Sequence, residues 1–248
     1  MLNLIGIGLS DEKDITLRGL DLIKKSKKIY LEDYTSILNV PINKLKTLYK
    51  KDIILANRKL IEENYSEILN DAEDKNISIL IIGDVFSATT HIDLFLEAKK
   101  REIKVNVVNN ASVLTAVGIT GLQLYKFGKI TSIPFHESKT CYDVLKFNLK
   151  NSLHTLFLLD LNPEKKEYLK IKDAIKKLIE SENKYKNKIF NEDVKCVACA
   201  RLGSQNPLIR YGKARDLIKF DFGKPPYCLI IPAKLHFMEE EALQELYR

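Results

Sequence analysis

The sequence has no tryptophan, only 4 cysteines and no long apolar run, and each deficit excludes a class of protein. Four scattered cysteines in 248 residues cannot form the disulfide framework of a small secreted domain. The longest apolar stretches, such as Ile79–Ile82 and Leu229–Pro232, have the length of a strand, whereas a membrane-spanning helix needs roughly 18 residues. The apolar N-terminus lacks a basic region and soon turns acidic, so it does not resemble a signal peptide. We therefore expect a cytoplasmic protein without a membrane partner.

The net charge is also small and indicates little about function. The 40 Lys and Arg against 33 Asp and Glu leave a net charge of only +7, too mild to indicate nucleic-acid binding. Glu164–Lys188 holds 9 lysines against 5 acidic residues, +4 of that total. Only two aromatic residues, Tyr168 and Tyr185, lie in this stretch and they do not alternate with the lysines, so it is predicted to be a solvated helix face and loop. No direct nucleic-acid partner is expected.

What is present is an alternation of short apolar runs and amphipathic stretches in the first half. We expect helices over Asp14–Ser26, from Asn57 to about Ala72, and over Thr90–Lys100. Strands without internal polar alternation, separated by helices, predict a parallel sheet covered on both faces. The expected strands are Leu2–Ile7, Lys28–Leu31, Ser78–Ile82 and Val105–Val108.

The second half is mixed but less regular. Strands are expected at Thr155–Leu161, Lys195–Ala200 and Tyr227–Pro232, with a helix from about Ile171 between the first two. Turn residues break Gly203–Gly223 into short pieces, as antiparallel strands require. The sequence therefore predicts two α/β domains, residues 1–110 with a mostly parallel sheet and residues 111–248 with a mixed sheet.

The segment Gly6-Ile7-Gly8-Leu9-Ser10 follows a strand and precedes a helix, where a dinucleotide fold places its phosphate loop. The third glycine of G-x-G-x-x-G is missing, and Asp11 with Glu12 stands there instead. An acidic pair would repel a pyrophosphate, so a tight strand-to-loop turn is favoured over phosphate binding. The turn can still offer backbone contacts to a ligand without phosphate.

Polar residues gather at three further strand ends. Gly83–His91 combines a carboxylate, hydroxyl groups, an imidazole and an aromatic ring, although Thr89 or Thr90 can also serve simply as the N-cap of the next helix. Asn109–Ser112 follows the next strand, with Ser112 as a possible helix cap, and Leu158–Asp160 ends another. Ligands of open α/β sheets bind at the carboxyl ends of strands, so these loops predict one composite pocket.

Several common chemistries find no support. Cys196 and Cys199 form a C-x-x-C, but positions three apart on a strand point to opposite faces, so buried structural thiols are favoured. The histidines show neither H-x-x-x-H nor H-E-x-x-H spacing, and no metal site is expected. No G-x-S-x-G or Walker lysine motif is present, which disfavours a hydrolase triad and a P-loop enzyme.

Several long motifs, in order, resemble the diphthine synthases, methyltransferases of diphthamide biosynthesis within the tetrapyrrole methylase-like superfamily. They are LIGIGLSDEKDITLRGL, YLEDYTSIL, GDVFSATTHIDL, VVNNASVLTAVGITGLQLYKFG, HTLFLLDL, ARLGS and LHFMEEEAL. The resemblance is poor across Asn162–Asp193. It implies two α/β domains, a homodimer, and S-adenosyl-L-methionine (SAM) in a cleft between the domains. It also implies methylation of the amino group of a modified histidine on translation elongation factor 2.

The resemblance also implies a set of SAM contacts, while no catalytic residue is assigned. The implied contacts are Leu9, Asp84, Ser87, Ser112, Val113, Leu159, Leu202 and His236. The sequence departs from the family where Val85 and Ser87 stand in place of the usual proline and glycine, and Phe237 replaces a common proline. A positive φ at Ser87 would strain that residue by roughly 1 kcal/mol.

Methyl transfer from a sulfonium is an in-line displacement that mainly needs the two reactants held in line, which contributes roughly 7–11 kcal/mol. This is consistent with the lack of an obvious acid–base pair in the sequence. Other functions left open are a related methyltransferase acting on rRNA or a tetrapyrrole, and a non-catalytic basic module binding translation factors or RNA. A nicotinamide oxidoreductase ranks last, since the third glycine is missing.

Overall fold

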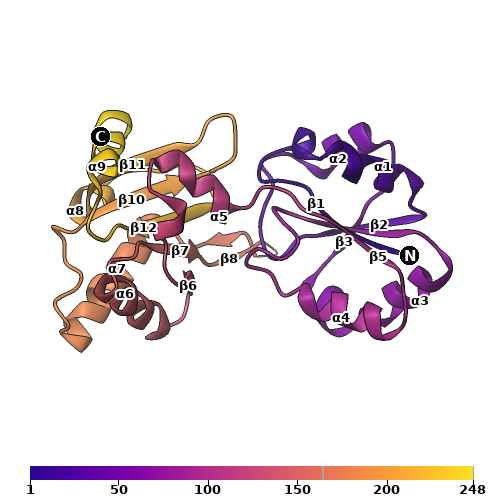
Figure 1. The fold of residues 1–248 in the computed structure, drawn as a ribbon, viewed down its shortest axis with the longest axis horizontal. Coiled ribbons are helices and arrows are strands. Elements are labelled where there is room, and N and C mark those ends of the chain that lie inside the picture. Colours follow the sequence, from indigo (N-terminus) through magenta and orange to yellow (C-terminus); the bar gives the residue numbers. More distant parts are fainter. Residues whose placement is uncertain (164, 248) are drawn as a thin grey trace. The chain divides into compact units, whose positions relative to one another are not determined.

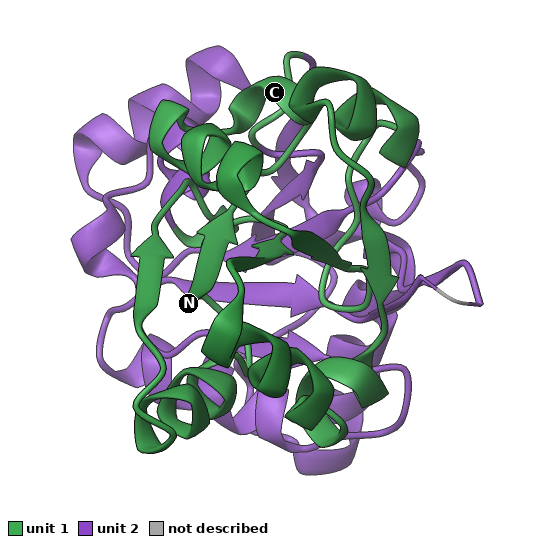
Figure 2. Ribbon diagram, turned by 90° about the vertical axis from the view of Figure 1, so that its right-hand side faces the viewer, with its two compact units in different colours: residues 1–114, 203–205 green, residues 115–202, 206–248 purple. Residues whose placement is uncertain are grey.

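The structure, a computed structural model, describes residues 1–163 and 165–247. The chain divides into two compact units, coloured separately in Figure 2. Unit 1 comprises residues 1–114 and 203–205, and unit 2 comprises residues 115–202 and 206–248. The predicted division after residue 110 stays a prediction.

Unit 1 (Figure 1) is built on five strands that are all parallel. Their order in the sheet is β3-β2-β4-β1-β5. This confirms the parallel sheet predicted from the unalternating apolar runs. The added edge strand β3 has only three residues, too few for a recognisable sequence pattern. The strands are β1 (Leu2–Gly6), β2 (Lys28–Glu32), β3 (Ile54–Ala56), β4 (Ile77–Ile81) and β5 (Val105–Val108).

Helices cover both faces of this sheet, each with its own apolar core. Successive residues of β1 divide between the two faces, since Leu4 packs with α3 and α4 while Ile5 packs with α1 and α2. Both faces are therefore apolar, which explains the lack of alternation. The helices are α1 (Leu17–Lys25), α2 (Ile42–Tyr49), α3 (Ser66–Asp74) and α4 (Ile92–Lys100), with short turns at Glu12–Asp14 and Lys59–Glu63.

Two local predictions in unit 1 were wrong. The helix expected from Asn57 is interrupted: Asn57 does accept from the N–H of Leu60 (3.0 Å), but a new helix starts at Ser66. Neither threonine caps α4, because the N-cap residue is His91 and no side chain accepts a cap bond there. The threonine hydroxyls instead donate to groups that lie before α4: Thr89 Oγ1 to Val85 O and Thr90 Oγ1 to Glu62, both at 2.6 Å.

Unit 2 contains a mixed sheet in the order β11-β10-β12-β7-β6, in which only β6 and β7 run parallel. The predicted strand Thr155–Leu161 ends at Leu159, and Leu161–Asn162 (β8) instead pairs with Glu167–Tyr168 (β9). The sheet strands are β6 (Thr131–Ile133), β7 (Thr155–Leu159), β10 (Lys195–Ala200), β11 (Leu208–Lys213) and β12 (Tyr227–Ile231).

The main core of unit 2 lies between this sheet and helices α6, α7 and α8. Cys196 belongs to it and Cys199 does not, as opposite faces of a strand require, and all four cysteines are buried and unbridged. None of the helices in the described part of the chain is long and apolar enough to span a membrane. The helices are α6 (Thr140–Lys150), α7 (Ile171–Tyr185), α8 (Ala214–Leu217) and α9 (Phe237–Leu246), with α5 (Val113–Ala116) and short turns Val117–Thr120 and Leu124–Lys126 before them.

Candidate functional site

The carboxyl ends of β4, β1 and β5 lie side by side in the sheet of unit 1, and the three predicted loops leave from them. Two of these loops are joined through their glycines: Gly83 N–H donates to Gly8 O (2.7 Å) and Gly8 N–H to Gly83 O (3.3 Å). Both glycines have left-handed φ values, +79° at Gly8 and +87° at Gly83, which other residues rarely adopt. The sequence brings the two loops together through backbone contacts that need glycine on both sides.

In the glycine turn after β1, the backbone amides already bind a carboxylate of this chain. One carboxylate oxygen of Asp14 accepts the amides of Leu9 (3.1 Å) and Ser10 (2.7 Å). In a dinucleotide-binding fold, amides in such a turn bind the phosphate. Here they are occupied by a side chain, and a Cβ at Gly8 would lie 2.3 Å from that of Asp14. The structure thus supports the tight turn and gives a physical reason against phosphate binding.

Asp84 ties the loop after β4 to the loop after β5. Its Oδ1 accepts from Phe86 N–H (3.2 Å) and Ser87 Oγ (3.0 Å), and its Oδ2 accepts from Asn109 Nδ2 (3.0 Å) and Asn110 N–H (3.1 Å). The residue is buried, and burial by itself would raise the pKa of its carboxyl; the four donors outweigh it and lower the pKa. Asp84 is therefore an ionised hub with all four lone pairs used, which disfavours a role as general base.

Asn110 joins the same arrangement and was not among the predicted site residues. Its Nδ2 donates to Gly6 O (2.9 Å) and to Asp14 O (3.0 Å), while its backbone amide binds Asp84. One side chain thus connects the end of β1, the glycine turn and the loop after β5. Its place in the polar run Asn109–Ser112 was the available sequence signal, but its partners lie about a hundred residues away.

Leu9 lies beside two glycines of unit 1. A Cβ built on Gly83 would be 3.7 Å from Leu9 Cδ2, and one on Gly203 would be 2.7 Å from Leu9 Cβ. Gly203 has a φ of +83°, so this position needs glycine for its conformation as well as for space. The ARLGS motif thus contributes its glycine to the surroundings of Leu9, a residue predicted to contact SAM.

The strain anticipated at Ser87 is absent there, because the positive φ belongs to its neighbour Ala88 (φ +61°). Ser87 donates its hydroxyl to Asp84 and is only partly buried. Val85 is fully buried in the core of unit 1. The two departures from the family pattern therefore leave the loop closed on Asp84.

Ser112 and Val113 lie just after the Asp84-bound asparagines. Ser112 is buried, and its Oγ accepts from Leu114 N–H (3.2 Å), so the expected capping role is confirmed. Val113, partly buried, is the first residue of α5. With Leu9, Asp84 and Ser87, they are the predicted SAM contacts that unit 1 holds at its strand ends. As SAM contacts they stay predictions.

Unit 2 holds the other three predicted contacts. Leu159 is the last residue of β7, and Leu202 is buried two residues after β10. His236 is exposed at the N-cap of α9, where its Nδ1 accepts from Met238 N–H (3.3 Å). Because β12 runs antiparallel to β7 and β10, Leu159 and Leu202 lie at one end of the sheet, and His236 lies at the other, beside His154 at the start of β7. The structure therefore does not bring His236 together with the other two, and as SAM contacts all three stay predictions. Among the residues that the structure describes, no cluster of three or more His, Cys, Asp or Glu side chains is suited to a metal ion.

Comparisons with known proteins agree with this architecture. The sequence pattern of the tetrapyrrole (corrin/porphyrin) methylases matches residues 1–218. A diphthine synthase from Methanocaldococcus jannaschii is 49% identical over 99% of this chain and 98% of its own length. An Arabidopsis thaliana protein named "probable diphthine methyl ester synthase" is 42% identical over 98% and 97%. A crystal structure of a diphthine synthase matches with a TM-score of 0.92 and 35% identity, covering 99% of this chain and 95% of that one.

Proposed function

The chain belongs to the tetrapyrrole methylase family, in its diphthine synthase branch, and from this membership we propose that it methylates translation elongation factor 2. It is a SAM-dependent methyltransferase of diphthamide biosynthesis. The target that we propose is the amino group of the modified histidine. The observation that carries this proposal is similarity to diphthine synthases over the whole chain.

The strand ends of unit 1 fit SAM chemically. SAM carries a sulfonium cation, and the ionised carboxylate of Asp84 supplies a negative charge near the predicted contacts. A Cβ at Gly83 would lie no closer than 3.7 Å to Leu9 and 3.8 Å to Ala111 O, so the backbone there can be approached closely. We propose Leu9, Asp84, Ser87, Ser112 and Val113 as SAM contacts within unit 1, and Leu159 and Leu202 as SAM contacts within unit 2; His236 is left out, because it lies at the opposite end of the unit 2 sheet from Leu159 and Leu202.

SAM supplies a methyl group on a sulfonium whose departure leaves a neutral thioether. The residues around it then have to hold and orient, because no proton needs to be given to the leaving group. Asp84 fixes the loops after β4 and β5, and Asn110 fixes them to the glycine turn. Deprotonation of the acceptor amine is not assigned to any residue.

Incubation with methyl-labelled SAM and elongation factor 2 from cells that lack the methylation step tests the proposal. We expect label on the factor, and mass spectrometry of the product then separates methylated amine from methyl ester. Label on RNA or on a tetrapyrrole would instead support one of the related methyltransferases. No label on any of them, together with no SAM binding by calorimetry, would leave the basic binding module.

We also propose a homodimer located in the cytoplasm, which the family resemblance supports. Sedimentation equilibrium is expected to give twice the mass of one chain, independent of SAM. A mass equal to one chain at micromolar concentration would refute the dimer without affecting the proposed reaction. Fractionation of the source cells tests the location.

A further inference from the structure

A cavity of about 330 Å³ lies in unit 2, at the start of α7, and is called the α7 cavity below. Its walls come from the first turn of α7, from residues 218–223 after α8, and from Tyr227 at the start of β12. Pockets that hold small molecules begin at about 300 Å³. The fold thus builds a cavity of useful size from three segments that are far apart in the sequence.

The lining of the α7 cavity carries a net positive charge. Lys170, Lys172 and Lys219 line it, and within the described part of the chain none of these lysines has an ion pair or a side-chain hydrogen bond. The lining holds one carboxylate, that of Asp221, which accepts from the amide of Gly223 (2.9 Å). An excess of ammonium groups around a cavity favours an anionic ligand.

Two of these lysines occupy positions that do not favour α7 itself. Lys170 is the N-cap residue and Lys172 lies in the first turn, where the positive end of the helix dipole repels a cation. Lys170 also makes no side-chain cap hydrogen bond, which serine or aspartate would make. Asp173 is the anion that suits a first turn. The stability of the helix therefore gives no reason for the two lysines.

A second cavity of unit 2, about 290 Å³ in volume and beside the end of β6, also has lysines in its lining. There Lys177 Nζ donates to Phe135 O (2.8 Å), and Lys184 forms an ion pair with Glu137. These lysines hold the loop that follows β6. Of the two cavities, the α7 cavity is the one whose lysines remain for a ligand.

Aromatic rings form another part of the wall of the α7 cavity. Phe220 and Tyr227 line it, and the exposed ring of Phe220 packs edge-on against the buried Phe222, with centroids 5.0 Å apart. The guanidinium of Arg210 lies 4.7 Å from the centroid of Phe220. Arg201 holds the chain here by donating to Phe222 O (3.0 Å). A ring fixed in this way can stack on a planar ligand.

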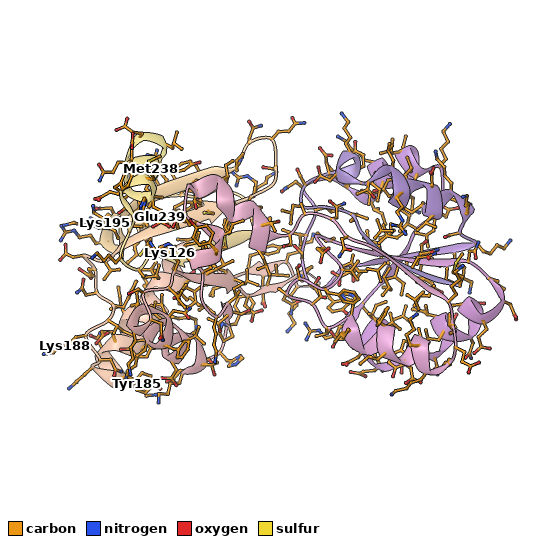
Figure 3. The ribbon with its side chains drawn as sticks, viewed as in Figure 1. Lys126, Tyr185, Lys188, Lys195, Met238 and Glu239 are labelled. Carbon is orange, nitrogen blue, oxygen red and sulfur yellow. The ribbon has the colours of Figure 1, made fainter. Side chains whose placement is uncertain are left out.

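The fold supplies what the lysine-rich stretch lacks in the sequence, namely aromatic residues beside its lysines. Phe220 and Tyr227 meet only the first lysines of this stretch, and Figure 3 labels Tyr185, the last residue of α7, and Lys188 at the opposite end of the helix. Ammonium groups beside aromatic rings bind the phosphate and the base of a nucleotide. We propose that the α7 cavity binds a nucleoside monophosphate unit, either free or within single-stranded RNA.

Calorimetric titration with AMP tests the proposal, with adenosine and ribose 5-phosphate as fragments that each lack one recognised group. AMP should bind at least about tenfold more tightly than either fragment, because the lysines contact the phosphate and the rings contact the base. Absence of AMP binding at about 1 mM would overturn the proposal. Equal affinity for AMP and ribose 5-phosphate would also overturn it, since the rings would then contribute nothing.

Phe220→Leu and Lys172→Met should each weaken AMP binding by about fivefold or more. Their matched controls are Lys188→Met and Phe147→Leu, the latter an exposed ring with Lys129 Nζ 5.0 Å from its centroid. All four substituted side chains are exposed, so the variants are expected to fold, which urea unfolding checks. Neither control residue lines the cavity, and both controls should bind AMP as the wild type does. Equal losses in a variant and its control would contradict the assignment.

An oligoadenylate of about ten nucleotides distinguishes the two sources of the ligand. Binding about tenfold tighter than AMP, and weaker as salt rises, supports RNA, whereas affinity no higher than that of AMP supports a free nucleotide. SAM has a cationic sulfonium and no phosphate, so it should not displace AMP. Displacement by SAM would overturn a separate site. AMP binding without SAM binding would overturn the proposed methyl transfer alone, on which this inference does not depend.

Discussion

Replacing Asp84 with asparagine changes one oxygen into an NH2 group at the residue that joins two loops of unit 1. The substituted side chain would keep one acceptor oxygen for two of the four donors. Asn109 can rotate its amide and Ser87 its hydroxyl to accept from the new NH2, but the backbone amides of Phe86 and Asn110 cannot. In either orientation, one partly buried backbone N–H faces a donor.

The expected loss of stability follows from this mismatch between donors and acceptors around residue 84. An unsatisfied buried amide costs about 1–3 kcal/mol, and hydrogen bonds to a charged acceptor are worth about 1.5–3 kcal/mol against about 1 for neutral ones. We expect Asp84→Asn to lower the free energy of unfolding of unit 1 by about 2–4 kcal/mol. SAM affinity should fall by at least about tenfold, since both loops lose their common anchor.

Urea unfolding followed by a fluorescent probe in unit 1 measures the first quantity, and calorimetry measures the second. Asp93→Asn serves as the control, because it removes the same charge from an exposed position in the first turn of α4. That change should cost at most about 1 kcal/mol through the helix dipole and leave SAM binding unchanged. Stability of Asp84→Asn within about 1 kcal/mol of the wild type, with normal SAM affinity, would refute the reasoning.

Three further expectations concern neighbouring features. Ser87→Gly should lower stability by about 1 kcal/mol in urea unfolding, because it removes the bond to Asp84 and adds backbone entropy without relieving a positive φ; an increase in stability would contradict this. Gly203→Ala should lower the free energy of unfolding by about 2–3 kcal/mol and weaken SAM binding, because the new Cβ would lie 2.7 Å from Leu9 Cβ and the residue has a φ of +83°. If urea unfolding and SAM calorimetry are both unchanged, the position tolerates a side chain. The free energy of unfolding should fall as the pH drops below 6.5, because the unfolded chain protonates His154 before the folded chain does. It should fall further between pH 4.5 and about 2, as Glu239 is protonated. A pH titration of chemical unfolding that is flat in the wild type, or unchanged by His154→Gln, would disprove this.

Much of unit 1 was predictable because its signals are local. Apolar runs gave four of the five strands, and their lack of alternation gave a sheet covered on both faces, as Leu4 and Ile5 confirm by packing into different cores. The three-residue strand β3 was missed, because its place depends on pairing with β2 and not on its own pattern. The short strand β6 and helix α6 in unit 2 were missed as well.

The site was less predictable than the fold. The strand-end loops could be found from their composition, but Asp84 was predicted as a ligand contact without its four internal donors. Asn110 carries no local signal for its role, because its partners are distant in sequence. Threonines before α4 were predicted as caps from proximity alone, whereas each hydroxyl had another acceptor within reach. Hydrogen bonds across the fold decide such cases, and a single sequence does not contain them.

The carboxylate of Asp14 in the glycine turn has a consequence for selectivity. A methyltransferase works in a cell where ATP and NAD share the adenosine part of SAM and are abundant. Discrimination is a difference of affinities, and it can come from rejecting the competitor. A turn that already holds its own negative charge on the amides of Leu9 and Ser10 has nothing to offer a phosphate and repels it. The turn thus excludes nucleotides by occupying their place, while a ligand with a sulfonium in that position meets no such repulsion.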